Sequence, residues 1–151
     1  MLNVVLYQPE IPHNTGAVGR LCLATGARLH LIKPLGFTID DRQLKRAGLD
    51  YWKQVDVRVW DSWEALCEHA GKARFFFLST KAKASHWDAA FCDDTFLVFG
   101  PETRGLPETM LNEHAQSSFR IPMKEEARSL NLATAVGIVL YEALRQIQHG
   151  S

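Results

Sequence analysis

Short apolar runs alternate along the chain with segments of helical periodicity. Four runs are β-branched or aromatic and apolar at nearly every position, which is typical of strands buried on both faces. These runs are residues 2–7, 28–32, 74–78 and 96–99. Val55, Val57 and Val59 alternate with other side chains, and this pattern predicts an edge or half-exposed strand. A sixth candidate, 119–121, is short and stops at Pro122, which has no amide hydrogen for a strand ladder.

The strongest helical periodicity lies near the C-terminus. Apolar residues from Leu132 to Ile147 recur at spacings of three and four. The opposite face of this predicted helix is also apolar over its first three turns, at Ile138 and Tyr141 for example. A helix that is apolar nearly all round needs cover on two sides, so we expect this one to pack against more than the sheet.

Start and end signals predict four further helices. The residues that mark the start and the end of each helix are, in chain order, Asn14 and Gly26, Asp40 and Gly48, Asp61 and Gly71, and Pro107 and Leu111. Strands and helices therefore alternate from end to end, which indicates one α/β domain over residues 1–151, a parallel sheet with helices on both faces. In such a fold the ligand site lies beyond the carboxyl ends of the strands.

Composition removes several classes of protein. The chain has 151 residues, 46% of them hydrophobic, and 17 basic residues balance 17 acidic ones. A disordered or fibrous chain is therefore not expected, and net charge alone does not indicate nucleic acid or a membrane. The three cysteines form no CxxC pair, and no export signal or membrane-spanning run precedes or interrupts the chain, so we expect a cytoplasmic protein.

Several familiar motifs are missing from the sequence. It contains no GxGxxG, no GxxxxGK[ST], no HExxH and no GxSxG, which disfavours nicotinamide enzymes, P-loop enzymes, zinc proteases and α/β-hydrolases. The six histidines are scattered without the spacing of metal ligands. We expect no metal site.

Three polar or glycine-rich segments instead follow predicted strands. In the first, residues 11–20, Asn14 and Arg20 are either a helix cap and a surface charge or members of a pocket where the guanidinium binds phosphate. The second, residues 99–107, reads FGPETRGLP, and its glycines and prolines predict a rigid loop with exposed backbone. In the third, residues 121–133, Ser129 or Asn131 can cap the last helix, whose first amides could also meet a ligand.

Basic residues gather in two places. One is the acid-free stretch 72–83, and the other includes Lys33, Arg42, Lys45 and Arg46. Such runs are most often solvated faces, but if they converge they could bind a phosphate backbone.

In this order and at these separations, NTGAVGR, FGPETRGLP and SLNLATAVGIVLYEALR resemble the three motifs of the SPOUT (SpoU–TrmD) superfamily of RNA methyltransferases. The similarity spans the whole chain and is greatest to the minimal, YibK-like enzymes that methylate the 2′-hydroxyl of the tRNA wobble nucleotide. The resemblance implies a deep C-terminal trefoil knot, S-adenosylmethionine as cofactor, and a homodimer packed through the knot region and the last helix. It implies tRNA as partner, leucine isoacceptors in particular, with no DNA, membrane or metal.

The resemblance also implies roles for individual residues. The cofactor positions are Leu78, Ser79, Thr80, Gly100, Glu102, Ile121, Met123, Ser129 and Leu130. The catalytic positions are Arg20, Tyr141, Asn14, Ser129 and Asn131. The substrate positions are Arg20 and Arg104, to which the charge pattern adds Lys33, Arg42, Lys45 and Arg46. A guanidinium rarely loses its proton, so Arg20 is left open as either the base or a phosphate clamp.

Two other functions remain possible at this point. The same fold could serve as a non-catalytic RNA-binding or assembly factor, although the retained motif residues argue against it. An unrelated doubly wound nucleotide-binding domain is disfavoured by the missing phosphate-binding motifs.

Overall fold

Seven parallel strands form one sheet in the computed structural model, which describes residues 1–47 and 51–149. The strands are β1 (Asn3–Tyr7), β2 (Arg28–Ile32), β3 (Val57–Trp60), β4 (Phe75–Leu78), β5 (Ala84–Ser85), β6 (Phe96–Phe99) and β7 (Ser118–Arg120). Their order is β3-β2-β1-β6-β4-β7-β5, and every neighbouring pair is parallel. The predicted parallel sheet is confirmed, and β3 is an edge strand. The two-residue strand β5 was not predicted, because so short a segment has no periodicity to read.

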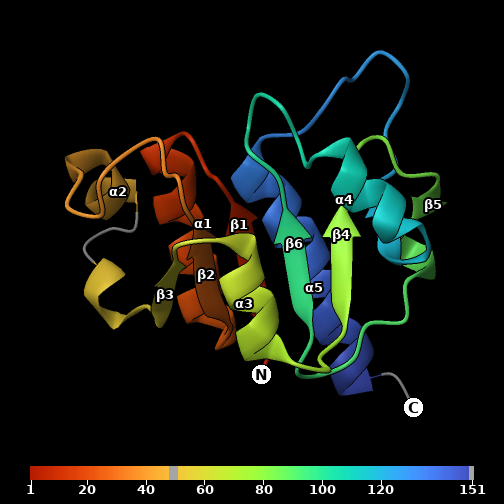
Figure 1. Ribbon diagram of the computed structural model, residues 1–151, viewed down its shortest axis with the longest axis horizontal. Helices are drawn as coiled ribbons and strands as arrows, with labels where there is room; N and C mark the ends of the chain where they lie inside the picture. The colour runs from red at the N-terminus through yellow and green to blue at the C-terminus, as the bar shows by residue number, and fades with distance from the viewer. Residues whose placement is uncertain (48–50, 150–151) are drawn as a thin grey trace.

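Within the described residues, five α-helices connect the strands and cover the sheet (Figure 1). They are α1 (Pro12–Thr25), α2 (Arg42–Ala47), α3 (Trp63–Ala70), α4 (Glu108–Glu113) and α5 (Leu132–His149). The part of the chain that the structure describes also has short 3-10 turns at η1 (Trp52–Gln54), η2 (His86–Asp88) and η3 (Ala115–Ser117). Among the described residues, no helix is long and apolar enough to cross a bilayer.

Two hydrophobic cores lie on opposite faces of the sheet. Val4 and Leu6 of β1 belong to a core that includes residues of α1, α2 and α5. Val5, which points the other way, belongs to a second core with residues of α3 and α4. Successive residues of a strand face opposite sides, so both faces of a doubly covered strand must be apolar. Helices on both faces are therefore confirmed.

The helix ends correct some of the predicted caps. Asn14 is not the cap of α1: the helix begins at Pro12, because proline fits the first turn, and Asn14 is buried inside it. The cap of α3 is Ser62, one residue after Asp61, and its hydroxyl accepts from the Ala65 amide at 3.1 Å. Gly26 ends α1 with φ of 74°, as predicted, since glycine adopts that left-handed conformation without a steric penalty.

Two further end signals differ from the prediction or lie outside the description. Asp41, not Asp40, accepts hydrogen bonds from the amides of Gln43 and Leu44 at the start of α2. Gly48, predicted to end that helix, lies outside the described residues. Pro107 caps α4 from just before its first turn.

The sheet order determines where a site can form. Because β6, β4 and β7 are neighbours and all run the same way, the loops that follow them lie at one edge of the sheet. Figure 1 shows the loops after β6 and β7 above the strand arrowheads, next to the start of α5. The C-terminal trefoil knot implied by the family resemblance stays a prediction.

Candidate active site

A cavity of about 470 Å³ lies at the carboxyl ends of β4, β6 and β7. Its walls come from residues 78–81, 99–106 and 121–135, with Ile11 and Asn14 at one side. These segments are distant in sequence, and the parallel sheet brings them together. A volume of this size is in the range of roughly 300–1,000 Å³ that small-molecule sites occupy.

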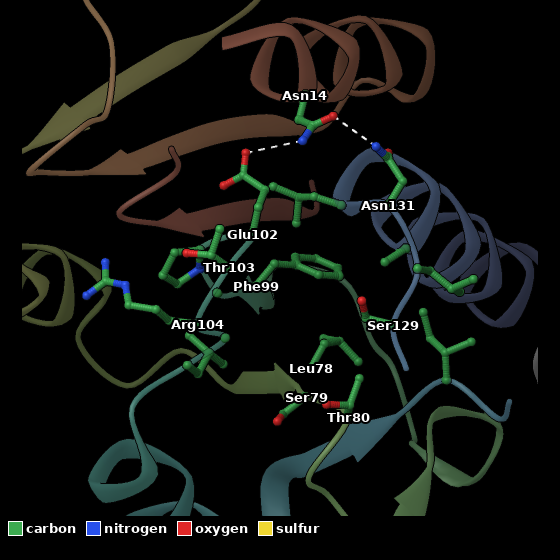
Figure 2. A pocket seen from close by; sticks show the side chains of 18 of the residues that line it. Asn14, Leu78, Ser79, Thr80, Phe99, Glu102, Thr103, Arg104, Ser129 and Asn131 are labelled. Carbon is green, nitrogen blue, oxygen red and sulfur yellow. Dashed lines mark hydrogen bonds between the residues drawn. The ribbon is translucent and has the colours of Figure 1, made fainter. Parts of the chain in front are cut away.

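All nine positions predicted to hold the cofactor line this cavity. They are Leu78, Ser79, Thr80, Gly100, Glu102, Ile121, Met123, Ser129 and Leu130. Apolar side chains alternate with hydroxyls and exposed backbone around the wall, and Ser129 faces the space from the side opposite Arg104 (Figure 2). Apolar walls with a few polar groups suit a purine nucleoside. The residues present therefore fit an adenosine-containing cofactor.

Local hydrogen bonds shape the walls formed by residues 78–81 and 99–106. The Ser79 amide donates to the Phe119 carbonyl at 3.0 Å, which extends the pairing of β4 with β7 into the loop. The Ser79 hydroxyl then accepts from the Lys81 amide at 3.1 Å and turns the chain. In the second wall, the Gly105 amide donates to the Pro101 carbonyl at 2.9 Å and closes a tight turn.

Gly100 is required by the packing of its own loop. A Cβ atom at this position would lie 2.3 Å from the Leu106 amide nitrogen and 2.4 Å from the Gly105 carbonyl carbon. Both neighbours are backbone atoms, which cannot move aside like the end of a flexible side chain. Any side chain here would thus displace the wall of the cavity before it reached a ligand.

Glu102 lines the cavity, but its carboxylate points to the start of α1 (Figure 2). Oε1 accepts from the Glu10 amide at 2.8 Å, and Oε2 accepts from the Ile11 amide at 2.8 Å and from Asn14 Nδ2 at 3.2 Å. A negative charge at a helix N-terminus is favourable because the free amides there carry partial positive charge. This carboxylate joins the second segment to the first.

The two asparagines extend that connection to the last helix. Asn131 Nδ2 donates to Asn14 Oδ1 at 3.0 Å, as the dashed line in Figure 2 marks. Asn131 Oδ1 accepts from the amides of Ala133 and Thr134 and so caps α5, which confirms one of the two predicted caps. One chain of hydrogen bonds therefore runs from Glu102 through both asparagines to α5.

The remaining predicted residues divide into two groups. Arg104 lies at the margin of the cavity, where its side chain extends away from Ser79 and Thr80 (Figure 2). Arg20 is exposed on α1, six residues beyond Asn14, and six helical residues span about 9 Å. Tyr141 is 51% exposed on α5. Neither Arg20 nor Tyr141 lines the cavity.

The basic residues suggested by the charge pattern also lie elsewhere. Arg42, Lys45 and Arg46 are exposed on α2. Lys33 lines a second cavity of about 450 Å³ beside the start of α3, where its ammonium group is 3.2 Å from Asp61. The structure does not bring these four side chains to the first cavity.

The cavity includes residues that sequence reasoning missed. They are Ile11, Lys81, Phe99, Pro101, Thr103, Gly105, Leu106, Leu132 and Ala135. All but Lys81 and Ala135 belong to the three segments singled out in the sequence, so treating each segment as a continuous wall would have found the other seven. Lys81 directly follows the predicted Ser79 and Thr80.

Comparison with known proteins gives the family. Residues 1–141 match the SpoU rRNA Methylase family. The chain belongs to this family. The match begins before β1 and extends into α5, so it includes all three segments that form the cavity.

Relatives of this SpoU-family chain include enzymes of tRNA and rRNA modification. It is 51% identical over 147 residues to a tRNA (cytidine(34)-2'-O)-methyltransferase of Methylovorus glucosotrophus, covering 97% of this chain and 96% of the relative. A solved structure on the 2-OH methylation of C/U34 on tRNA is 52% identical, with a TM-score of 0.93 over 97% of this chain and 95% of that one. An AdoMet-bound rRNA methyltransferase from Sinorhizobium meliloti is 26% identical, with a TM-score of 0.85 over 96% and 56%.

The ionisable side chains of the SpoU-family cavity limit the reactions that the cavity itself can catalyse. Among the described residues that line it, the ionisable side chains are Lys81, Glu102 and Arg104. The Glu102 carboxylate already accepts three hydrogen bonds, from the Glu10 amide and from Ile11 and Asn14 of the first segment. The described part of the chain also contains no group of three metal-ligating side chains. The described lining of the cavity is thus suited to bind and orient a ligand, because its carboxylate is already hydrogen-bonded and is not available as a general base.

Proposed function

We propose that this SpoU-family protein is an S-adenosylmethionine-dependent methyltransferase that modifies the ribose 2′-hydroxyl of the wobble nucleotide in tRNA. One observation carries the proposal: residues of all three motifs, distant in sequence, line a single cavity together with the loop 78–81, although the first motif contributes only Asn14. The name of the Methylovorus relative, which matches over nearly its whole length, supports the substrate and the position.

Each of the three wall segments, 78–81, 99–106 and 121–135, would contact part of the cofactor. Leu78, Ile121 and Leu130 would cover the adenine faces, and the backbone around Gly100 would approach its edge. Hydroxyls of Ser79, Thr80 and Ser129 can donate to ribose or carboxylate oxygens. When bound, the cofactor supplies a methyl group already activated by a sulfonium centre. The protein's task is then to align the accepting oxygen, which is where orientation contributes most.

Arg20 and Tyr141 would act on the RNA side of the reaction. Arg20 remains either the proton acceptor or a phosphate clamp, and both roles require more than the cavity of one chain, because Arg20 lies outside it. We propose a homodimer packed through α5 and the knot region. The exposed Ile138 and Tyr141 on α5 supply apolar surface for that contact.

The proposed substrate is a tRNA with an unpaired cytidine or uridine at the wobble position, leucine isoacceptors in particular. An unpaired nucleotide can be turned out of its stack and read in a loop-lined cavity. Arg104 at the margin of the cavity is the first candidate for a phosphate contact. The reaction is expected in the cytoplasm, where tRNA is modified and cysteines stay reduced.

The test is methyl transfer to total tRNA. The protein is incubated with unfractionated tRNA and labelled S-adenosylmethionine, and the modified nucleoside is mapped. We expect a 2′-O-methylated wobble nucleotide, and we expect KM for tRNA to rise steeply with salt because phosphate contacts release counterions. Saturable cofactor binding by calorimetry without any methyl transfer would instead favour a non-catalytic RNA-binding factor.

A further inference from the structure

The Glu10 carboxylate binds the residue that follows Glu102, as Glu102 binds the residue that follows Glu10. No motif role is assigned to Glu10. Glu10 Oε1 accepts from the Thr103 amide at 2.8 Å. The Thr103 hydroxyl is 2.7 Å from Oε1 and 2.9 Å from Oε2 of the same carboxylate. Glu102, next to Thr103, binds the amides of Glu10 and Ile11. Each glutamate therefore accepts backbone hydrogen bonds from the segment that carries the other.

This crossed pair holds the exposed tip of the turn, whose base is fixed by the buried Pro101 and Leu106. Thr103, Arg104 and Gly105 are all exposed, so burial contributes little to the position of the tip. Hydrogen bonds to an ionised carboxylate are shorter and stronger than neutral ones. They also keep the pKa of Glu10 below its ordinary value, chiefly through the Thr103 amide and hydroxyl. Glu10 thus stays ionised at neutral pH.

The segment that carries Glu10 also contacts the Arg104 side chain, through Gln8. Gln8 has φ of 50°, a region that residues other than glycine rarely adopt, and its Oε1 lies 3.4 Å from Arg104 Nη2. Among the described residues, no carboxylate lies within ion-pair distance of the Arg104 guanidinium. Unusual backbone conformations persist where the surrounding structure holds them, often at functional sites. The guanidinium donates to a neutral amide and is attracted by the Glu10 carboxylate without pairing with it, so it is free to contact a phosphate.

We propose that Glu10 is a positioning residue: it fixes the Thr103–Arg104 turn at the margin of the cavity, so that Arg104 can bind a phosphate of the RNA substrate. This role rests on the proposed function, because it needs a polyanionic substrate. Glu10 itself touches neither reactant. Its carboxylate acts through the hydrogen bonds to Thr103, and the substrate contact belongs to Arg104 alone.

The proposal is tested by a double-mutant cycle in the full-length protein. Glu10→Ala and Arg104→Ala are each expected to raise KM for tRNA about tenfold, the effect of losing one charged contact. The Kd for S-adenosylmethionine, measured by calorimetry, is expected to stay within about twofold because neither change removes a cofactor contact. The double variant should have the same KM for tRNA as Arg104→Ala. Once the Arg104 guanidinium is absent, the position of the turn no longer affects phosphate binding. Glu68→Ala, an exposed carboxylate on α3, is the control and should leave KM unchanged.

Each outcome of this cycle decides the question. An additive double variant, with KM raised about a hundredfold, would show that Glu10 acts independently of Arg104 and would overturn the proposal. An unchanged KM in Glu10→Ala, or a cofactor Kd that changes as much as KM, would overturn it too. If Glu10→Ala does not fold, Thr103→Val replaces the hydroxyl with a methyl group and keeps the amide bond to Glu10. It should then raise KM for tRNA less than tenfold and add nothing to Arg104→Ala, and an unchanged KM or an additive double variant would overturn the proposal. Wild-type protein that transfers no methyl group to tRNA would contradict the proposed function and the positioning role together.

Discussion

A row of buried polar groups crosses the sheet from β3 toward β6. Trp60 Nε1 donates to His30 Nδ1 at 3.0 Å, and His30 Nε2 is 2.8 Å from Asn3 Oδ1. Asn3 Nδ2 continues the row to the Thr95 carbonyl at 3.3 Å. The tryptophan can only donate, so His30 Nδ1 must accept and Nε2 must carry the proton. The row is complete only when His30 is neutral.

Stability should therefore fall in mild acid. Burial of His30, together with the nearby charges of Arg28 and Arg58, lowers its pKa from 6.5 to about 3. Between these two values the unfolded chain binds a proton that the folded chain does not, so stability is complete above pH 6.5 and is lost as the pH falls toward 3. At pH 5 the free energy of unfolding should be about 2 kcal/mol lower than at pH 7, taking 1.36 kcal/mol per pH unit.

Urea unfolding at pH 7 and pH 5 measures this loss. His30→Gln keeps a donor and an acceptor but does not titrate, so the variant should start from lower stability and lose less between the two pH values. His13, exposed on α1, provides the control, because His13→Gln should leave the wild-type pH dependence unchanged. An equal decrease in wild type and His30→Gln would show that other groups cause the acid sensitivity.

Single residues were the hardest feature to predict from the sequence. Asn14 has the residue type and position of a helix cap, but its amide joins Glu102 to Asn131 instead. The partners of Glu102 lie 88 to 92 residues away along the chain, so no local pattern could indicate which way that carboxylate points. Residue type predicts the chemistry of a side chain, while its direction depends on the tertiary fold.

At the scale of elements, the start of α5 separates two residues that the sequence treated as equivalent. Asn131 accepts from two amides at the helix start, whereas Ser129 is exposed and precedes the helix by three residues. Asn131→Ala should lower the free energy of unfolding by about 1–2 kcal/mol, since it removes a cap and a hydrogen bond to Asn14. Thermal unfolding with Ser129→Ala as the matched control measures the difference.

The comparison also separates stability from function. Ser129→Ala should leave the midpoint of unfolding nearly unchanged while weakening cofactor binding, because its hydroxyl faces the cavity. A large loss of stability in Ser129→Ala, with little in Asn131→Ala, would contradict the assignment of the cap.

At the scale of the whole molecule, the sequence predicted architecture better than detail. The strand runs and their helical connections were enough to expect a parallel sheet, and parallel strands end at one edge. That geometry is why separated segments could be expected around one cavity, and all nine positions predicted to hold the cofactor line it. By contrast, β5 has two residues and no periodicity, and the knot implied by the family resemblance cannot be derived from periodicity at all. The only local sign of the proposed dimer is an apolar face on the last helix.

The α5 face leads to a prediction about assembly. Ile138 is 38% exposed and Tyr141 51% exposed on adjacent turns, which leaves apolar surface uncovered in a single chain. If a second copy covers this face, the protein should sediment near 34 kDa, twice the chain mass of 17.0 kDa. Ile138→Glu would place a charge in the contact, and the variant should sediment as a monomer and lose methyl transfer while keeping its circular dichroism spectrum. Ala115→Glu, exposed on η3, is the control. A wild-type monomer with full activity at assay concentration would contradict the dimer, and Arg20 would then have to reach the substrate from its own chain.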